Sequence, residues 1–141
     1  MENKIIIYTD GACKGNPGPG GWGAVIIESN NEIELFGKKD NTTNNIMEMT
    51  AAVKALEYYS EKKNITLYTD SNYLKLGITN WIYSWKKNNW LNSKKESIKN
   101  KSIWVVLDKL NTLHNVEWRW VKAHNGDKYN ERADELATSA I

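Results

Sequence analysis

The chain has 141 residues, a mass of 16.2 kDa and a net charge of +2 at pH 7. This length suits one domain, residues 1–141, with a core large enough to fold without disulfides or structural metal. The single cysteine, Cys13, excludes an internal disulfide framework. The longest apolar runs, residues 5–8 and 24–27, fall far short of the roughly 20 residues of a membrane-spanning helix. No basic-then-apolar leader precedes Ile5, so we expect a cytoplasmic protein without membrane contact. No pattern specifies a dimer interface, so a monomer is the default expectation.

Three strands are expected at the start of the chain. Residues 4–9 form an unbroken apolar run, typical of a strand covered on both faces. Residues 15–21 are rich in glycine and proline and are expected to form a loop. The runs 22–28 and 33–38 flank the polar residues 29–31, which predicts an antiparallel hairpin.

The apolar period changes to that of a helix from Thr43 onward. The spacing of three or four predicts a helix to about Ser60, capped by residues 42–44, with an inward stripe of Ile46, Met49, Val53 and Leu56. The expected elements that follow are a strand over 65–69, a helix capped by Ser71, a helix around 103–110, a strand over 116–121 and a helix over 130–141. This order predicts an α/β fold: a mixed five-stranded sheet, first antiparallel and then parallel, flanked by helices.

Two strands end in the same Tyr-Thr-Asp sequence, at Asp10 and at Asp70. Ligands of open α/β sheets bind at the carboxyl ends of the strands, so neighbouring strands would bring these carboxylates together. Glu48 lies early in the first helix beside two methionines, and Asp134 lies among Ala133, Leu136 and Ala137 in the last helix. An apolar patch is a poor place for an unpaired charge.

Each acid alone also fits an ordinary structural role, as a turn residue, a helix-dipole partner or, for Asp134, a partner of Arg132. Together, however, four acids in one cleft would repel one another unless a cation lay between them. The two histidines, His114 and His124, are far apart, and no Cys/His pair has zinc spacing. Carboxylate oxygens suit Mg²⁺ or Mn²⁺, and a pair of such ions about 4 Å apart is typical of phosphoryl chemistry.

Four segments resemble, in order and spacing, the motif blocks of type 1 ribonuclease H: YTDGACKGNPGPGGWG, TTNNIMEMTAAVKALE, LYTDSNYL and VKAHNGDKYNERADELA. The resemblance spans nearly the whole chain and implies the ribonuclease H-like fold. It also implies endonucleolytic cleavage of the RNA strand of RNA–DNA hybrids with Mg²⁺ or Mn²⁺, leaving 5′-phosphate and 3′-hydroxyl ends. By this resemblance, the metal ligands are Asp10, Glu48, Asp70 and Asp134, and His124 assists proton transfer or product release from a mobile loop.

The same resemblance implies substrate contacts for a larger set of residues. Those expected to face the minor groove of the hybrid, or in the case of Thr43 a DNA phosphate, are Cys13, Asn16, Thr43, Asn44, Asn45 and Asn72. The 2′-hydroxyls in this wide, shallow groove distinguish RNA from DNA. Glycines between Gly11 and Gly21 would let backbone approach the substrate beside Asp10, although turn geometry alone would also explain them.

Residues 81–101 form a basic segment, whereas the rest of the chain has a net negative charge. Six lysines and one glutamate give this stretch a local charge of +5, interleaved with tryptophans. A basic run is often only a solvated face. The resemblance instead implies a basic handle that grips the DNA strand, with the contacts assigned to Trp81, Trp85, Lys86 and Lys87. Trp104, Trp118 and Trp120 are expected to pack in the core.

The sequence departs from the family pattern at two positions. Ala123 replaces the usual glycine before the histidine, which bears on the freedom of that loop, and Asn72 replaces a common glutamine, which shortens one amide contact. All four acids are present. Two alternatives stay open at this point: a catalytically silent nucleic-acid-binding module, and a DNA-cutting nuclease of the same fold.

Overall fold

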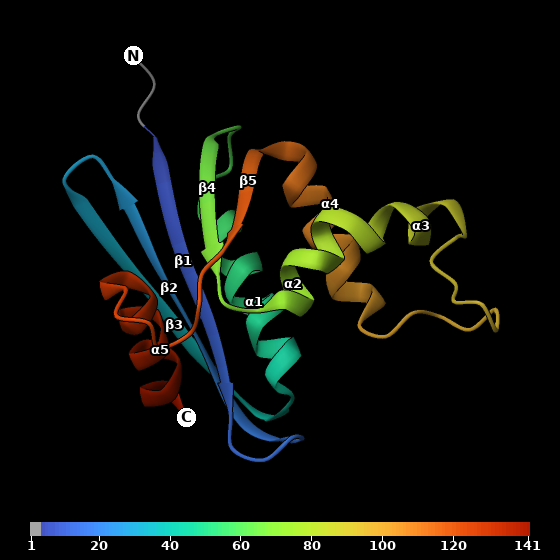
Figure 1. Ribbon diagram of the computed structural model, residues 1–141, viewed down its shortest axis with the longest axis horizontal. Coiled ribbons are helices and arrows are strands. Elements are labelled where there is room, and N and C mark those ends of the chain that lie inside the picture. Colours follow the sequence, from blue (N-terminus) through green and yellow to red (C-terminus); the bar gives the residue numbers. More distant parts are fainter. Residues whose placement is uncertain (1–3) are drawn as a thin grey trace.

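The computed structural model describes residues 4–141, so the first three residues of the expected domain lie outside the described range. One five-stranded sheet has the order β3-β2-β1-β4-β5 (Figure 1). The first three strands are antiparallel, β4 is parallel to β1, and β5 is parallel to β4. The mixed sheet predicted from the sequence is confirmed, with the strands β1 (Ile5–Cys13), β2 (Gly18–Glu28), β3 (Asn31–Thr42), β4 (Asn64–Thr69) and β5 (Asn115–Trp120).

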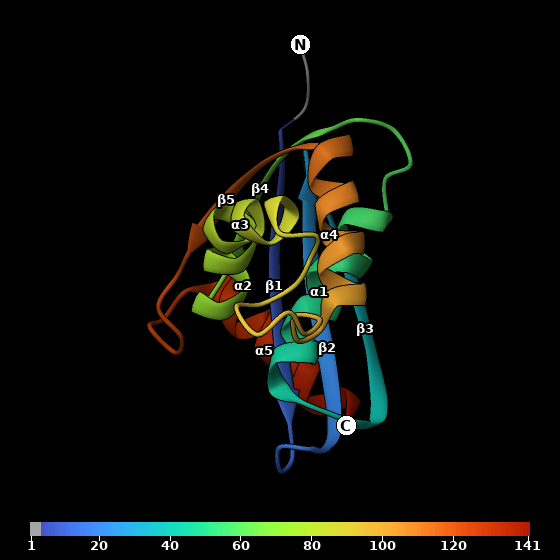
Figure 2. The same cartoon turned by 90° about the vertical axis from the view of Figure 1, so that its right-hand side faces the viewer.

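Helices cover both faces of the sheet (Figures 1 and 2). The bounds are α1 (Asn44–Glu57), α2 (Asn72–Leu76), the π-helical turn η1 (Gly77–Trp81), α3 (Ile82–Lys87), α4 (Lys101–Leu113) and α5 (Lys128–Ala140). The main apolar core lies between the sheet and the helices α1 and α4, and a smaller one lies under α5. The carboxyl ends of β1 and β4 are therefore flanked by α1 on one face and by α5 on the other.

The glycine-rich stretch is partly strand, so the expected loop over residues 15–21 was wrong for its second half. β2 begins at Gly18, and β1 continues past Asp10 to Cys13. A Cβ atom at Gly21 would collide with the carbonyl of Ala137 in α5, and one at Gly20 would lie 2.9 Å from the carbonyl of Ala12. The absence of side chains lets helix and strand backbones pack closely, which a turn-propensity argument does not predict.

Helix α1 begins as the sequence predicted. The Thr43 hydroxyl accepts a hydrogen bond from the Ile46 N–H at 3.2 Å, which satisfies one of the free donors of the first turn. The helix packs directly on Gly11, where a Cβ would lie 2.5 Å from the carbonyl carbon of Met47 and would also collide with the N–H of Glu48. The backbone at Gly11 is therefore approached closely by helix α1 of the same chain, and this contact places Glu48 beside β1.

The expected helix after Ser71 is divided into α2, η1 and α3. Ser71 caps it as predicted, accepting from the Leu74 N–H at 3.1 Å. The π-helical turn begins at Gly77, where a Cβ would collide with the ring of Trp104. Beyond α3, residues 88–100 form an irregular protrusion with one isolated bridge between Leu91 and Ser97 (Figure 1).

The three tryptophans expected in the core differ in their exposure. Trp104 is fully buried and Trp118 is 9% exposed, as predicted, but Trp120 is 46% exposed. Trp118 and Trp120 share one side of β5 because side chains alternate along a strand. The prediction failed for Trp120 because that residue ends the strand, beyond the main core cluster that contains Trp118 and Trp104.

We predict that Gly11→Ala costs about 3 kcal/mol of unfolding free energy, because the added methyl overpacks two backbones that cannot move independently. Denaturant unfolding measures this loss. The matched control is Gly126→Ala, which has open space around it and only a left-handed φ of 83° to strain, and which should cost roughly 1 kcal/mol. Equal losses in the two variants would contradict the packing role of Gly11.

Candidate metal centre

The two Tyr-Thr-Asp endings lie side by side. The parallel ladder of β1 and β4 ends at the pair Thr9 and Thr69, so Asp10 and Asp70 are the next residues at the same edge of the sheet. The Asp10 side chain is 4% exposed and its Oδ1 accepts a hydrogen bond from the Gly11 N–H at 2.9 Å. The parallel register thus brings together two acids that lie 60 positions apart in the sequence.

Glu48 joins these two acids from helix α1. Its side chain is 5% exposed, and its Oε1 is buried without a hydrogen-bond partner among the described residues. One carboxylate oxygen from each of Asp10, Glu48 and Asp70 lies within 4.8 Å of the others. Three carboxylates from a strand, a helix and a strand end therefore form one cluster, which we call the acidic cluster.

Asp134 and His124 lie beside the acidic cluster. Both line the same cavity of about 380 Å³, which also includes all three cluster acids. Asp134 comes from α5, and its negative charge contributes to the raised pKa of Asp10. His124 lies between β5 and α5 with a left-handed φ of 54°, and its charge opposes the rise in the pKa of Asp70. All five predicted catalytic positions thus meet in one place.

The protonation of the acidic cluster follows from its burial. Burial is the main cause that raises the pKa of Asp10 to about 8, with the charge of Asp70 next. Burial also raises the pKa of Glu48 well above its usual range, and the charge of Asp10 adds to it. For Asp70, burial again raises the pKa, while hydrogen bonds from Asp10 and Glu48 oppose the rise. Without a cation, a pKa of about 8 keeps Asp10 largely protonated at neutral pH, and burial favours the protonated forms of Glu48 and Asp70 as well.

The acidic cluster has the chemistry of a site for a hard divalent cation. Its donors are all oxygens, which suits ions such as Mg²⁺ or Mn²⁺ and not zinc or copper. The unpartnered Oε1 of Glu48 is a lone buried acceptor that a cation would satisfy. Anions that repel one another in a dry cleft become favourable ligands once a positive charge lies between them.

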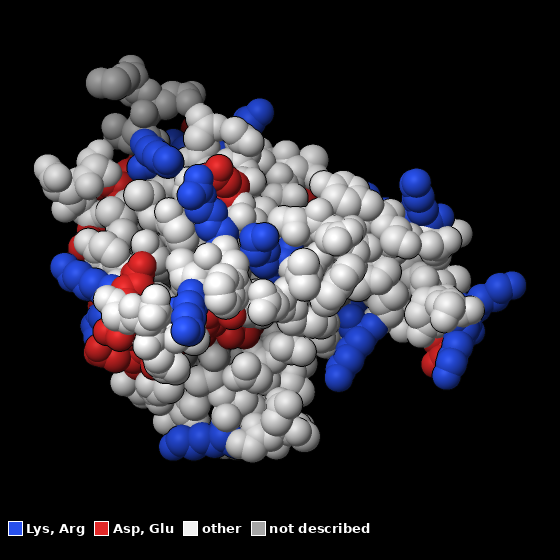
Figure 3. Space-filling view, viewed as in Figure 1, with Lys and Arg blue, Asp and Glu red and all other residues white. Residues whose placement is uncertain are grey.

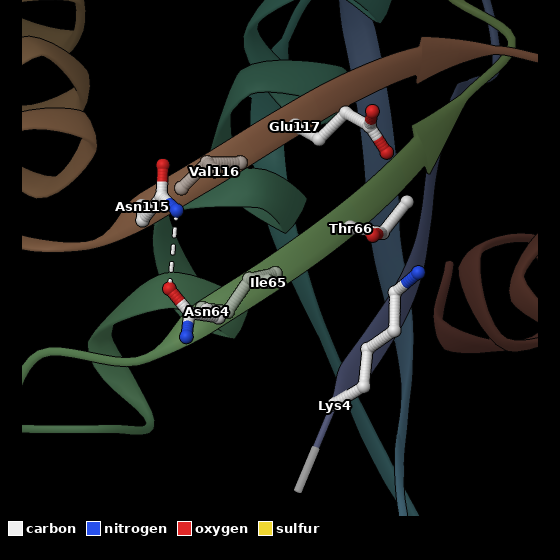
Figure 4. Close-up of a pocket in the computed structure, with 7 residues that line it drawn as sticks. All are labelled: Lys4, Asn64, Ile65, Thr66, Asn115, Val116 and Glu117. Atoms are coloured by element: carbon white, nitrogen blue, oxygen red, sulfur yellow. Dashed lines mark hydrogen bonds between the residues drawn. The ribbon is translucent and has the colours of Figure 1, made fainter. Parts of the chain in front are cut away.

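A second cavity differs from the cavity of the acidic cluster in the residues that line it. It holds about 500 Å³ at the opposite ends of β1, β4 and β5 (Figure 4). Among residues 4–141, Glu117 is the one acid that lines it, and Asn115 donates a hydrogen bond to Asn64 at 3.1 Å. Of the acids in this described range, several therefore converge at the carboxyl edge of the sheet, whereas one lines the cavity at the opposite edge.

The predicted groove-contacting residues lie in two groups. Asn44, Asn45 and Asn72 line the cavity of the acidic cluster. Ser71 and Tyr73 also line this cavity and were not among the predicted site residues, although they follow shortly after Asp70 in the sequence.

The second group lies around the start of α1 and is held by internal hydrogen bonds. The Asn16 Oδ1 accepts from the Asn44 N–H at 3.0 Å, and the Cys13 thiol donates to the carbonyls of Gly18 and Thr42. Thr43 is occupied as the helix cap. These contacts tie the loop between β1 and β2 to the helix that carries Glu48.

The residues predicted for the basic handle lie on and beside the protrusion. Trp85 packs against the buried Trp104 with ring centroids 5.2 Å apart, whereas Trp81 is 37% exposed. Lys86 forms an ion pair with Asp108 of α4 at 3.2 Å, and Lys87 ends α3 as an exposed residue. Basic side chains gather at the outer end of the protrusion in Figure 3.

An open mixed sheet with buried carboxylates at the carboxyl edge of two parallel strands is consistent with a metal-dependent enzyme of phosphoryl chemistry. The family model described as RNase H matches residues 2–141. The chain therefore belongs to the ribonuclease H family, whose members are endoribonucleases that depend on divalent metal ions.

Relatives in sequence and in structure agree with this family. The chain is 52% identical to a ribonuclease H of Wolbachia pipientis wMel over 99% of this chain and 97% of that protein, and 52% identical to one of Francisella philomiragia over 99% and 92%. Among solved structures, LC9-RNase H1, a type 1 RNase H, has a TM-score of 0.88 at 28% identity, covering 99% of this chain and 72% of that one. LC11-RNase H1 in complex with an RNA/DNA hybrid has a TM-score of 0.73 at 26% identity, covering 97% and 96%. Within residues 4–141, no helix combines the length and apolar character needed to cross a membrane.

We predict that Asp10→Asn stabilises the metal-free protein by about 1 kcal/mol, because it removes a buried acid that must either carry a charge repelled by its neighbours or bind a proton. Denaturant unfolding in chelator measures the change. Asp40→Asn, an exposed residue of β3, is the matched control and should change little. Destabilisation by Asp10→Asn in chelator would argue against crowded carboxylates.

We also predict that the metal-free protein becomes more stable as the pH falls from 8 to 6. The folded-state pKa of Asp10, about 8, exceeds its ordinary value of 3.8, so the native state binds more protons than the unfolded state in this range, and stability falls as the pH rises. The gain should be about 1 to 2 kcal/mol by unfolding in chelator. Asp10→Asn should flatten the profile; an unchanged slope would contradict the assignment to this group.

Proposed function

We propose that the protein hydrolyses the RNA strand of RNA–DNA hybrids, leaving 5′-phosphate and 3′-hydroxyl ends. The observation that carries the proposal is the acidic cluster, with three carboxylate oxygens within 4.8 Å and one unpartnered buried acceptor. Membership in the ribonuclease H family and the likeness to LC11-RNase H1, solved with an RNA/DNA hybrid, support it. We place this activity in the cytoplasm and in a monomer with one domain over residues 1–141.

Asp10, Glu48, Asp70 and Asp134 are the proposed metal ligands. Mg²⁺ is the proposed cofactor, with two ions in the presence of substrate, and Mn²⁺ is a functional substitute. Bound in this way, such ions lower the pKa of a coordinated water and stabilise the leaving oxygen of an in-line displacement. Asp134 lines this cavity but lies outside the acidic cluster of Asp10, Glu48 and Asp70. This wider spread of carboxylates supports a site that holds more than one ion.

His124 is the proposed proton carrier. It lines the cavity of the acidic cluster, close enough to Asp70 to affect its pKa, and it is exposed to solvent. An imidazole titrates near neutral pH and can move protons between the site and water. Ala123 precedes it where glycine is usual in the family, so we expect a stiffer loop.

The substrate contacts follow from the polar side chains around the site. Asn44, Asn45 and Asn72 present amides beside the acidic cluster, which suits 2′-hydroxyls and base edges of a shallow groove. Cys13 and Asn16 are proposed to extend this surface, and Thr43 to approach a DNA phosphate. The internal hydrogen bond from the Asn44 N–H to Asn16 supports a fixed arrangement of these groups.

Residues 81–101 are the proposed basic handle for the DNA strand. Trp81 and Lys87 are exposed there, while Trp85 anchors the protrusion to the core through Trp104. Lys86 would exchange its contact with Asp108 for a phosphate. Such contacts carry no sequence information and weaken with salt.

We predict that Asp10→Asn lowers cleavage of a labelled hybrid by at least about 10³-fold while the protein stays folded and binds the hybrid, because it removes a charge that stabilises the transition state. The assay compares hybrid, duplex DNA and duplex RNA with Mg²⁺ and with chelator. Asp40→Asn is the control and should cleave like wild type. Wild-type protein that binds hybrid but never cuts it would indicate a silent binding module, and preferred cleavage of duplex DNA would indicate a DNA nuclease.

A further inference from the structure

Three hydrogen bonds hold the backbone at and beside Asp70. The Thr69 carbonyl accepts from the Val121 N–H at 2.9 Å, and the Thr69 hydroxyl accepts from the Ser71 N–H at 3.0 Å. The Asp70 carbonyl accepts from the Trp120 indole N–H at 3.1 Å. The first two bonds fix the residues on either side of Asp70, and only the third reaches Asp70 itself.

The third bond comes from a side chain of another strand. Trp120 is the last residue of β5 and pairs with Thr69, the last residue of β4. Trp120 is 46% exposed, whereas Trp118 is 9% exposed. Burial of apolar surface therefore accounts for the position of Trp118 better than for that of Trp120. The indole N–H of Trp118 bonds instead to Asn111 of α4, at 2.9 Å, within the main core.

We infer that Trp120 is a positioning residue for the metal centre, which holds the Asp70 carbonyl and so fixes the direction from which the Asp70 carboxylate enters the acidic cluster. The inference rests on the proposed function, since it requires Asp70 to be a metal ligand. Groups that orient ligand residues tune metal affinity, because a ligand free to rotate must be ordered when the ion binds. Trp120, the last residue of β5 before the segment that carries His124, thereby constrains the position of Asp70.

Trp120→Phe tests the inference because it keeps an aromatic ring and removes the donor. Calorimetric titration of the metal-free protein with Mn²⁺ should show affinity about tenfold weaker than in wild type. Under saturating Mn²⁺ the KM for hybrid should stay unchanged. An affinity within twofold of wild type overturns the inference, as does a raised KM with unchanged metal affinity, which would make Trp120 a substrate contact.

The matched control is Trp118→Phe, which also removes an indole hydrogen bond from β5, but one made to Asn111 of α4 and not to a residue of the acidic cluster. It should lower the free energy of unfolding and leave the Mn²⁺ affinity within twofold of wild type. Equal weakening in both variants would show that loss of stability alone lowers the affinity, and would overturn the inference.

Replacement of Trp120 by benzothienylalanine keeps the shape of the bicyclic ring and exchanges only the N–H for sulfur. It should weaken Mn²⁺ binding as Trp120→Phe does. It tests the role of the indole N–H even where Trp120→Phe fails to fold. Wild-type affinity in this variant overturns the inference. Wild-type protein that binds no Mn²⁺ at all would instead overturn the proposed metal centre, a different result from binding that Trp120 does not affect.

Discussion

The structure depends on holding three carboxyl groups close together in a poorly solvated place, where each must either carry an unfavourable charge or bind a proton. Asp10, Glu48 and Asp70 repel one another and lose hydration, so each would lie further apart if the backbone allowed it. The parallel pairing of β1 and β4 fixes two of them, and the packing of α1 on Gly11 fixes the third. The energy of the rest of the fold keeps the cluster assembled until a cation neutralises it.

Close backbone packing is the means by which the scaffold achieves this. Helix α1 rests on β1 at Gly11, and α5 rests on β2 at Gly21 and Gly23, where any side chain would force the elements apart. The helices that carry Glu48 and Asp134 are thus placed by contacts of their own backbones. A site built on such rigid contacts varies less in geometry than one built on loops.

The parts proposed to meet the substrate are attached differently. The protrusion of residues 88–100 leaves the core after α3 and returns at α4, and an aromatic group of Tyr73, Trp85 and Trp104 anchors its base. His124 lies in a short segment between β5 and α5. A rigid centre keeps the metal-ligating carboxylates in a constant geometry. More exposed surroundings suit an enzyme that must bind and release a long substrate.

The order of the elements could be predicted from apolar periodicity, and the four acids could be selected as candidates from their places after paired Tyr-Thr-Asp endings or among apolar helix residues, because these are local patterns. The cap at Ser71 was predicted in the same way, and the cap of the first helix was predicted to lie within residues 42–44, of which Thr43 is the one whose hydroxyl accepts from a nearby N–H. Three features could not be predicted in this way: Gly18–Gly21 is strand, the helix after Ser71 changes to a π-helical turn at Gly77, and the Trp120 indole reaches the Asp70 carbonyl. Each of these depends on a partner far away in the chain, such as Ala137 or Trp104, and no local pattern contains the distance between two such residues.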